Sequence, residues 1–168
     1  MAAEKLLVYI LRRDLRLADN PIFHYLSTAN HGFRYLLPIY VFPPHQIELS
    51  GFLNDGETSP YPPARSQLGN FWRCGPHRAK FIAQSVWDLK TSLDSCSSGL
   101  EIRLGDFPDV VSDIINHFKA TGTPVSDIWM TEEMSYEEIQ EQNSVAAACE
   151  SSKVNFRLWQ DEKYFIDE

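Results

Sequence analysis

The feature that most constrains this chain is an apolar segment close to its beginning, residues 5–11, which stops abruptly at a run of charged side chains. Mainly aliphatic and aromatic residues without polar alternation are typical of a strand buried on both faces, as in the middle of a parallel sheet. A central strand needs other strands on both sides, so the rest of the chain should supply them. Ligands of open α/β sheets bind at the carboxyl ends of the strands, and here that end carries Arg12, Arg13, Asp14 and Arg16.

The remaining sequence alternates between strand and helix patterns, which predicts an α/β fold: a parallel sheet with helices on both faces. Asn20 and Pro21 suit the start of a helix, and Ser135 with Glu138 matches a capping box. Pro38 requires an edge, a bulge or a poorly paired position in the second strand. Further strands are predicted at residues 34–42, 100–104, 126–130 and 154–159, and helices at 22–26, from 75 to near 97, at 107–121 and from 136 through 148.

Two segments lack such patterns. Residues 45–74 are rich in Gly, Pro, Ser, Asn and Asp, which predicts a long loop that is either functional or mobile. The tail, residues 160–168, contains no further element long enough to pack. The helix beginning near residue 75 is amphipathic, and its expected core positions recur at three- and four-residue spacing: Phe81, Ile82, Val86, Leu89 and Leu93.

Composition narrows the class of protein. With 168 residues, 43% of them hydrophobic, the chain has room for one domain with a real core. A net charge of −8 argues against DNA binding by this chain alone, because neutralising phosphates requires clustered Lys and Arg. No apolar run approaches the length of a membrane span. Three cysteines without a Cys-x-x-Cys pair suit reduced thiols, and the first strand begins too early for a targeting peptide, so cytoplasm or nucleus is expected.

The charged run after the first strand allows two interpretations. Its arginines could recognise an anion, or Asp14 and Asp19 could pair with them and fix the loop. The sequence has neither Gly-x-Gly-x-x-Gly nor Gly-Lys-Ser/Thr after this strand, so the usual dinucleotide and P-loop phosphate sites lack their loop.

A second charged group follows the fourth predicted strand. Glu137, Glu138 and Glu141 suit the first turns of a helix, where acidic side chains favour the macrodipole. Glu133 precedes that helix and is expected to point into the crevice at the end of the sheet. The five histidines show no metal-ligand spacing, and no local arrangement suggests a hydrolase triad.

Several segments together resemble the photolyase and cryptochrome family. Residues 7–21, from Leu-Val-Tyr-Ile-Leu-Arg-Arg-Asp-Leu-Arg to Ala-Asp-Asn-Pro, are similar to its opening signature. The segments Gly-Pro-His-Arg-Ala-Lys-Phe-Ile (75–82), Val-Trp-Asp-Leu (86–89) and Leu-Gly-Asp-Phe-Pro (104–108) resemble the DASH-type branch in particular. The similarity extends from residue 5 to 167, with the motifs in the family's order.

This resemblance implies the family's N-terminal α/β domain over residues 1–168, with a Rossmann-like sheet of strand order 3-2-1-4-5. In the family this domain holds an antenna chromophore, commonly methenyltetrahydrofolate, which passes excitation to FAD in a larger helical domain. The FAD-binding helical domain lies outside these residues, so no catalytic activity is expected of the chain itself. Blue-light photoreception or DNA repair would require a full-length protein.

The resemblance also suggests a folate site. Glu133 matches the family's acidic residue that accepts the paired N–H donors of a pterin, and Ser135 lies beside the expected pterin position. Phe42 could stack on the ring, and Arg12 or Arg13 could attract the anionic tail of the folate.

Two further classes of function remain open. The chain could be an orphan interaction module, whose surface for the helical domain pairs with a second copy or another protein. It could also be a flavodoxin-like enzyme that uses the same crevice for a different small ligand.

Overall fold

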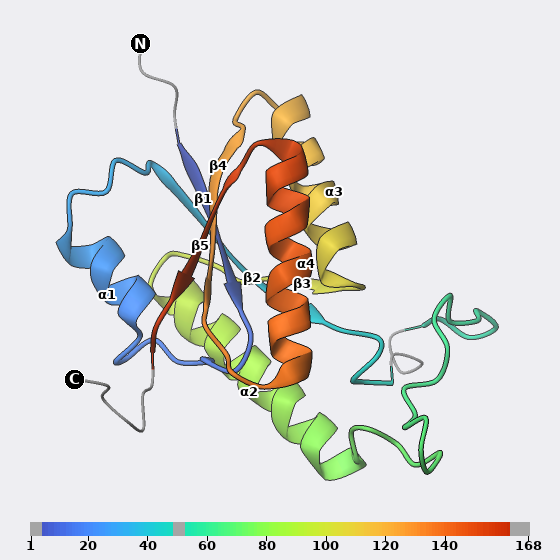
Figure 1. The fold of residues 1–168 in the computed structure, drawn as a ribbon. Coiled ribbons are helices and arrows are strands. Elements are labelled where there is room, and N and C mark those ends of the chain that lie inside the picture. Colours follow the sequence, from blue (N-terminus) through green and yellow to red (C-terminus); the bar gives the residue numbers. More distant parts are fainter. Residues whose placement is uncertain (1–4, 49–52, 162–168) are drawn as a thin grey trace, which may run out of the picture.

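The computed structural model describes residues 5–48 and 53–161, and it shows one sheet between two layers of helices (Figure 1). The predicted alternation of strands and helices is confirmed within a few residues at each boundary. The elements are β1 (Leu6–Leu11), α1 (Pro21–Thr28), β2 (Tyr35–Phe42), α2 (Pro76–Ser95), β3 (Glu101–Leu104), α3 (Phe107–Ala120), β4 (Val125–Thr131), α4 (Tyr136–Ser152) and β5 (Asn155–Trp159).

The five strands are all parallel and lie in the order β3-β2-β1-β4-β5, as expected from the family resemblance. Strand β1 is central, and all six of its residues are buried. The chain leaves β1 toward β2 on one side and later returns to β4 on the other. The order therefore reverses between β1 and β4, and the carboxyl ends of these two strands border the switch point at which α/β sheets bind ligands.

Each face of the sheet has its own hydrophobic core. Leu6, Val8 and Ile10 of β1 pack toward α3 and α4, whereas the alternate residues Leu7 and Tyr9 pack toward α1 and α2. Figure 1 shows these helix pairs on opposite faces of the sheet. Burying one such aliphatic side chain contributes roughly 1.5–3 kcal/mol, so β1 couples the two layers.

Pro38 lies where the sheet tolerates it. Its partner in β1 is Tyr9, and the pairing of β2 with β3 begins only at the next residue, Ile39. Because β3 does not reach Pro38, the missing N–H of the proline removes no bond to that strand. The prediction of a poorly paired position is confirmed.

The core face of α2 differs from the prediction at its beginning. Val86, Leu89 and Leu93 are buried, but Phe81 is 69% exposed. The first turns of α2 run beyond the carboxyl edge of the sheet, so they have no strand beneath them (Figure 1). Periodicity identifies the face of a helix but not how far the sheet beneath it extends.

The predicted long loop has no helix or strand in its described residues, 45–48 and 53–74, apart from an isolated antiparallel bridge between Arg65 and Trp72. Residues 49–52 lie outside the described part of the chain. The prediction for the tail, 160–168, also falls almost entirely outside it.

The helix caps confirm one prediction and correct another. Asn20 Oδ1 accepts hydrogen bonds from the amides of Ile22 and Phe23, both at 3.0 Å, as expected for the start of α1. Ser135 occupies the N-cap position of α4, but its side chain makes no capping bond. The carboxylate of Glu138 pairs with Arg13, so the predicted capping box is wrong.

The two caps give a matched stability test. Asn20→Ala removes both capping bonds and the bond from Asn20 Nδ2 to the Tyr9 hydroxyl (2.8 Å), so it should lower the free energy of unfolding by about 2 kcal/mol. Ser135→Ala should change it by less than about 0.5 kcal/mol. Urea unfolding of the two variants checks this, and equal losses would contradict the assignment of the caps.

Candidate functional site

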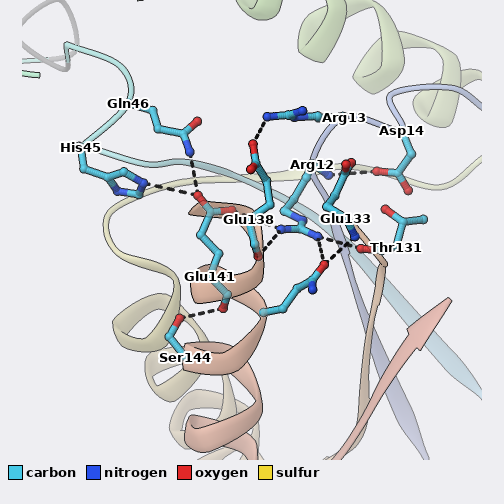
Figure 2. A network of polar contacts seen from close by, with 11 residues as sticks. Arg12, Arg13, Asp14, His45, Gln46, Thr131, Glu133, Glu138, Glu141 and Ser144 are labelled. Carbon is cyan, nitrogen blue, oxygen red and sulfur yellow. Dashed lines mark hydrogen bonds and ion pairs between the residues drawn. The ribbon is translucent and has the colours of Figure 1, made fainter. Parts of the chain in front are cut away.

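The switch-point edge is organised by Arg12, the first residue after β1, whose guanidinium is buried. Its two terminal nitrogens donate to the carbonyl oxygens of Thr131 (2.7 Å) and Glu138 (3.3 Å). They also donate to the side chains of Gln142 (2.8 Å) and Glu141 (3.2 Å). Figure 2 shows these bonds running from the end of β1 to the end of β4 and the first turns of α4. Arg12 therefore joins the three elements that form the edge.

The carboxylate partners of the arginines differ from the Asp14 and Asp19 of one sequence interpretation, although Arg16 also donates from Nε (3.2 Å) and Nη2 (3.1 Å) to the carbonyl oxygen of Asp19. Arg13 pairs with Glu138, and Arg16 binds Asp161 through both carboxylate oxygens at 2.7 Å. These partners are distant in sequence, and spacing alone could not reveal them. The segment is thus an ion-pair network with α4 and the chain after β5.

Asp14 has a different role. Its buried carboxylate accepts hydrogen bonds from the Tyr9 hydroxyl and from the backbone amide of Arg12 (3.0 Å). Burial, with the neighbouring Asp14 charge, raises the pKa of Tyr9, so the phenol keeps its proton and donates it in this bond. Asp14 thereby fixes the turn that directs Arg12 toward α4.

Burial lowers the pKa of Arg12 from its ordinary value, and the nearby carboxylate of Glu141 acts in the opposite direction. A guanidinium keeps its charge at neutral pH even so. Among the described residues, the Nε of Arg12 and the hydroxyl of Thr131 are buried without a hydrogen-bond partner.

A cavity of about 300 Å³ opens beside this network, at the lower end of the size of small-ligand sites. The lining combines carboxylates and arginines with aliphatic and aromatic side chains. Its lining residues are Arg12, Arg13, Leu15, Tyr40, Val41, Pro43, Gln46, Ile47, Arg78, Phe81, Ile82, Ser85, Phe107, Glu133, Glu138 and Glu141.

Three of the five residues expected at the site, Arg12, Arg13 and Glu133, line this cavity. Ser135 lines an adjoining cavity of about 430 Å³, which also contains Arg13 and Glu133. Phe42 is only 1% exposed and packs in the core against Tyr40, with ring centroids 4.9 Å apart.

Sequence reasoning missed Tyr40 and a face of α2 that borders the cavity. Phe81 and Ile82 each lie three or four residues from both Arg78 and Ser85, and this spacing was the available signal for a shared face. Burial, with smaller effects from Cys74 and Glu141, raises the pKa of Tyr40 to about 12, so its hydroxyl remains a proton donor at neutral pH.

Glu138 and Glu141 were expected to serve the helix macrodipole. The structure adds partners that this interpretation did not include, since both carboxylates are largely buried in ion pairs with Arg13 and Arg12. Glu133 differs from them: no hydrogen bond or ion pair involves its carboxylate within residues 5–48 and 53–161. Its backbone amide is held by Gln142 Oε1 at 2.6 Å, and the same oxygen binds Arg12.

The arrangement suits binding of a planar ligand with N–H donors. A free carboxylate and aromatic side chains border one cavity. No group of three or more His, Cys, Asp or Glu that could hold a metal ion occurs in the described part of the chain. Within that part, no helix is both long and apolar enough to cross a membrane.

A parallel sheet of this order, with a cavity at its switch point, defines an open α/β domain of the Rossmann-like type. The chain belongs to the DNA photolyase family, since that family's model matches residues 7–165. It corresponds to the N-terminal α/β domain of photolyases and DASH cryptochromes.

Two fungal relatives are similar over the whole chain. The identity is 54% to a cryptochrome DASH of Gibberella zeae, covering 100% of this chain and 24% of the relative. The identity to a mitochondrial cryptochrome DASH of Neurospora crassa is 50%, covering 99% of this chain and 23% of the relative. The chain thus spans about a quarter of the length of these curated relatives.

Solved structures share the fold at low identity. A Synechocystis cryptochrome superimposes with a TM-score of 0.71 at 20% identity, over 95% of this chain and 28% of that one. A Sulfolobus tokodaii photolyase described with two FAD molecules superimposes with a TM-score of 0.63 at 21% identity. The match covers 92% of this chain and 29% of the photolyase chain.

The importance of Arg12 can be tested by replacing its planar fork. Arg12→Lys cannot reach all four acceptors, so buried carbonyl and carboxylate groups lose their donors, and the free energy of unfolding should fall by about 3 kcal/mol. Arg103→Lys alters an exposed pair with Glu101 (2.9 Å) and should cost less than about 1 kcal/mol. Denaturant unfolding measures both, and a similar small loss in the two variants would refute the role of Arg12.

Proposed function

We propose that this domain binds a light-absorbing antenna chromophore, and that the chromophore is methenyltetrahydrofolate. The observation that carries the proposal is that Glu133, whose carboxylate has no hydrogen bond or ion pair within the described residues, lines a switch-point cavity together with aromatic side chains. When bound, the folate would supply absorption of light. Family membership supports a chromophore in this domain, and the chemistry of the lining residues supports a pterin.

Glu133 would hold the pterin. A pterin presents an N–H and an amino group side by side, and one carboxylate can accept both. The bond from the Glu133 amide to Gln142 fixes the backbone of Glu133, while leaving its carboxylate available to a ligand. The residue is therefore anchored without being neutralised.

The other lining residues of the cavity suit the ring faces and the anionic tail of the folate. Tyr40 and Phe81 line the cavity, and we assign ring contacts to them, because Phe42 is buried in the core and does not line it. The terminal nitrogens of Arg12 are already bonded within the protein, so the anionic tail would lie toward Arg13 and Arg78.

Larger activities belong to a longer protein. We propose that blue-light photoreception or DNA repair occurs only where this domain is joined to one that binds FAD. Binding of DNA by this domain alone is not expected, given its net charge of −8. Location in the cytoplasm or nucleus stays a prediction; the Neurospora crassa relative is named as mitochondrial.

The assignment of Glu133 predicts that Glu133→Ala abolishes retention of methenyltetrahydrofolate while the far-ultraviolet circular dichroism and unfolding midpoint stay unchanged. The measurement is absorbance of the protein after incubation with the folate and removal of free ligand. Glu132→Ala is the matched control, because Glu132 lines the adjoining cavity but not the first one. Equal folate retention by wild type and Glu133→Ala would exclude this pterin site.

A second candidate, a protein-interaction module, is favoured by the exposed hairpin of residues 65–72. Its base is closed by the Arg65–Trp72 bridge, and the Arg65 guanidinium stacks 3.8 Å from the Trp72 ring centre. Leu68 is fully exposed and Phe71 is 63% exposed. An ordered hairpin that presents apolar side chains to solvent is typical of a docking element.

If the hairpin mediates self-association, wild type should increase in mass with concentration, and Leu68→Ser combined with Phe71→Ser should remain monomeric. Analytical ultracentrifugation provides the measurement. Trp87→Ser is the control, since Trp87 is an exposed aromatic residue of α2 outside the hairpin. A monomeric wild type at all concentrations would exclude self-association, and association retained by the double variant would exclude the hairpin as its cause.

A further inference from the structure

A third cavity, of about 400 Å³, lies next to the proposed chromophore cavity, and the two share Glu141. His45 lines this third cavity and comes from the turn that follows β2. The same turn contributes Gln46 and Ile47 to the wall of the chromophore cavity. The turn thus lines both cavities, and the contacts that hold it in place also shape the chromophore cavity.

Glu141 holds the turn. Its Oε1 accepts a hydrogen bond from Gln46 Nε2 at 2.8 Å and lies 3.4 Å from His45 Nε2, while its Oε2 binds Arg12 at 3.2 Å. Figure 2 shows His45 and Gln46 approaching the Glu141 carboxylate together. One buried carboxylate therefore connects the turn after β2 to the end of β1.

His45 faces a second carboxylate on its other ring nitrogen. Its Nδ1 is 3.8 Å from Asp106 Oδ1, and Asp106 is the N-cap residue of α3 but makes no side-chain capping bond. Two carboxylates on opposite sides of an imidazole are both satisfied only by the doubly protonated ring. A neutral ring has one N–H and turns a lone pair toward the other carboxylate.

The remaining charges around His45 are mixed. Asp109 of α3 and Glu137 of α4 line the same cavity and favour a cation. Arg73 and the positive end of α3 oppose it. The hydrogen bond to Glu141 has the largest effect, and the pKa of His45 is raised from its ordinary value. Protonation therefore strengthens the contacts of the turn, and these contacts weaken as the pH rises through the His45 pKa.

We propose that His45 is a pH-sensitive positioning residue for the chromophore cavity. Protonated, it bridges Glu141 and Asp106 and holds the turn after β2 against α3 and α4. When it loses its proton, one bridge is lost, the wall formed by Gln46 and Ile47 loosens, and the ligand dissociates more readily. This inference rests on the proposed chromophore site, and it adds a regulation that the site residues alone do not contain.

The test measures the dissociation constant of methenyltetrahydrofolate between about pH 6 and pH 8, a window around the ordinary His pKa. The integrity of the free folate is checked spectroscopically at each pH. Wild type should bind about fivefold more weakly at the upper end. His45→Gln, which keeps a donor toward Glu141 but does not titrate, should show no such change.

His117→Gln is the matched control. His117 is an exposed histidine in the last turn of α3, at the opposite edge of the sheet, and the variant should retain the wild-type pH dependence. A pH dependence that persists in His45→Gln, or measurable wild-type binding without any pH dependence, would overturn the proposal.

A ligand-free measurement separates this proposal from the proposed function. In an NMR pH titration of the folded chain, the Gln46 side-chain amide should shift with the midpoint of His45 and should stop titrating in His45→Gln. If the folate does not bind at all, the proposed function fails, and the NMR titration alone tests whether the charge of His45 controls the turn. A Gln46 amide that does not follow His45 would then overturn the role of His45.

Discussion

The structure depends on a buried cation at the end of its central strand. Removing a guanidinium from water costs several kcal/mol unless its donors are satisfied, and for Arg12 the acceptors come from the end of β4 and the first turns of α4. Since β1 and β4 flank the switch point, the same bonds that satisfy Arg12 fix the width of the crevice there. The requirement to solvate one charge thus sets the geometry of the candidate site.

The three acidic residues Glu133, Glu138 and Glu141 differ in how their carboxylates are paired. Glu138 and Glu141 neutralise Arg13 and Arg12, so their carboxylates belong to the scaffold. Glu133 is positioned through its backbone amide, which bonds to a side chain that also binds Arg12. In the proposed function this carboxylate binds the ligand, and the bond to the backbone amide holds the Glu133 backbone without occupying the carboxylate.

The helices and strands could be predicted because they depend on local patterns, whereas the strand order followed from the family resemblance. The apolar run of β1, the periodic helices and the Asn20 cap are readable from neighbouring residues. The partners of the arginines were not readable, because Glu141 lies 129 residues after Arg12 and spacing carries no information about such contacts. The same limit explains Phe81, whose exposure depends on where the sheet ends, and Phe42, whose ring could point to either side of its strand.

Glu141 shows why scaffold and function are difficult to separate here. Its carboxylate compensates Arg12 on one side and receives His45 and Gln46 on the other, so any change in the charge of His45 acts on the same group that solvates the buried guanidinium. Glu141 is largely buried, but the His45 side chain is 40% exposed, so solvent screens part of this coupling. In the proposed regulation, the charge of His45 reaches the cavity wall through Glu141, which contacts both His45 and Gln46 and also lines that cavity.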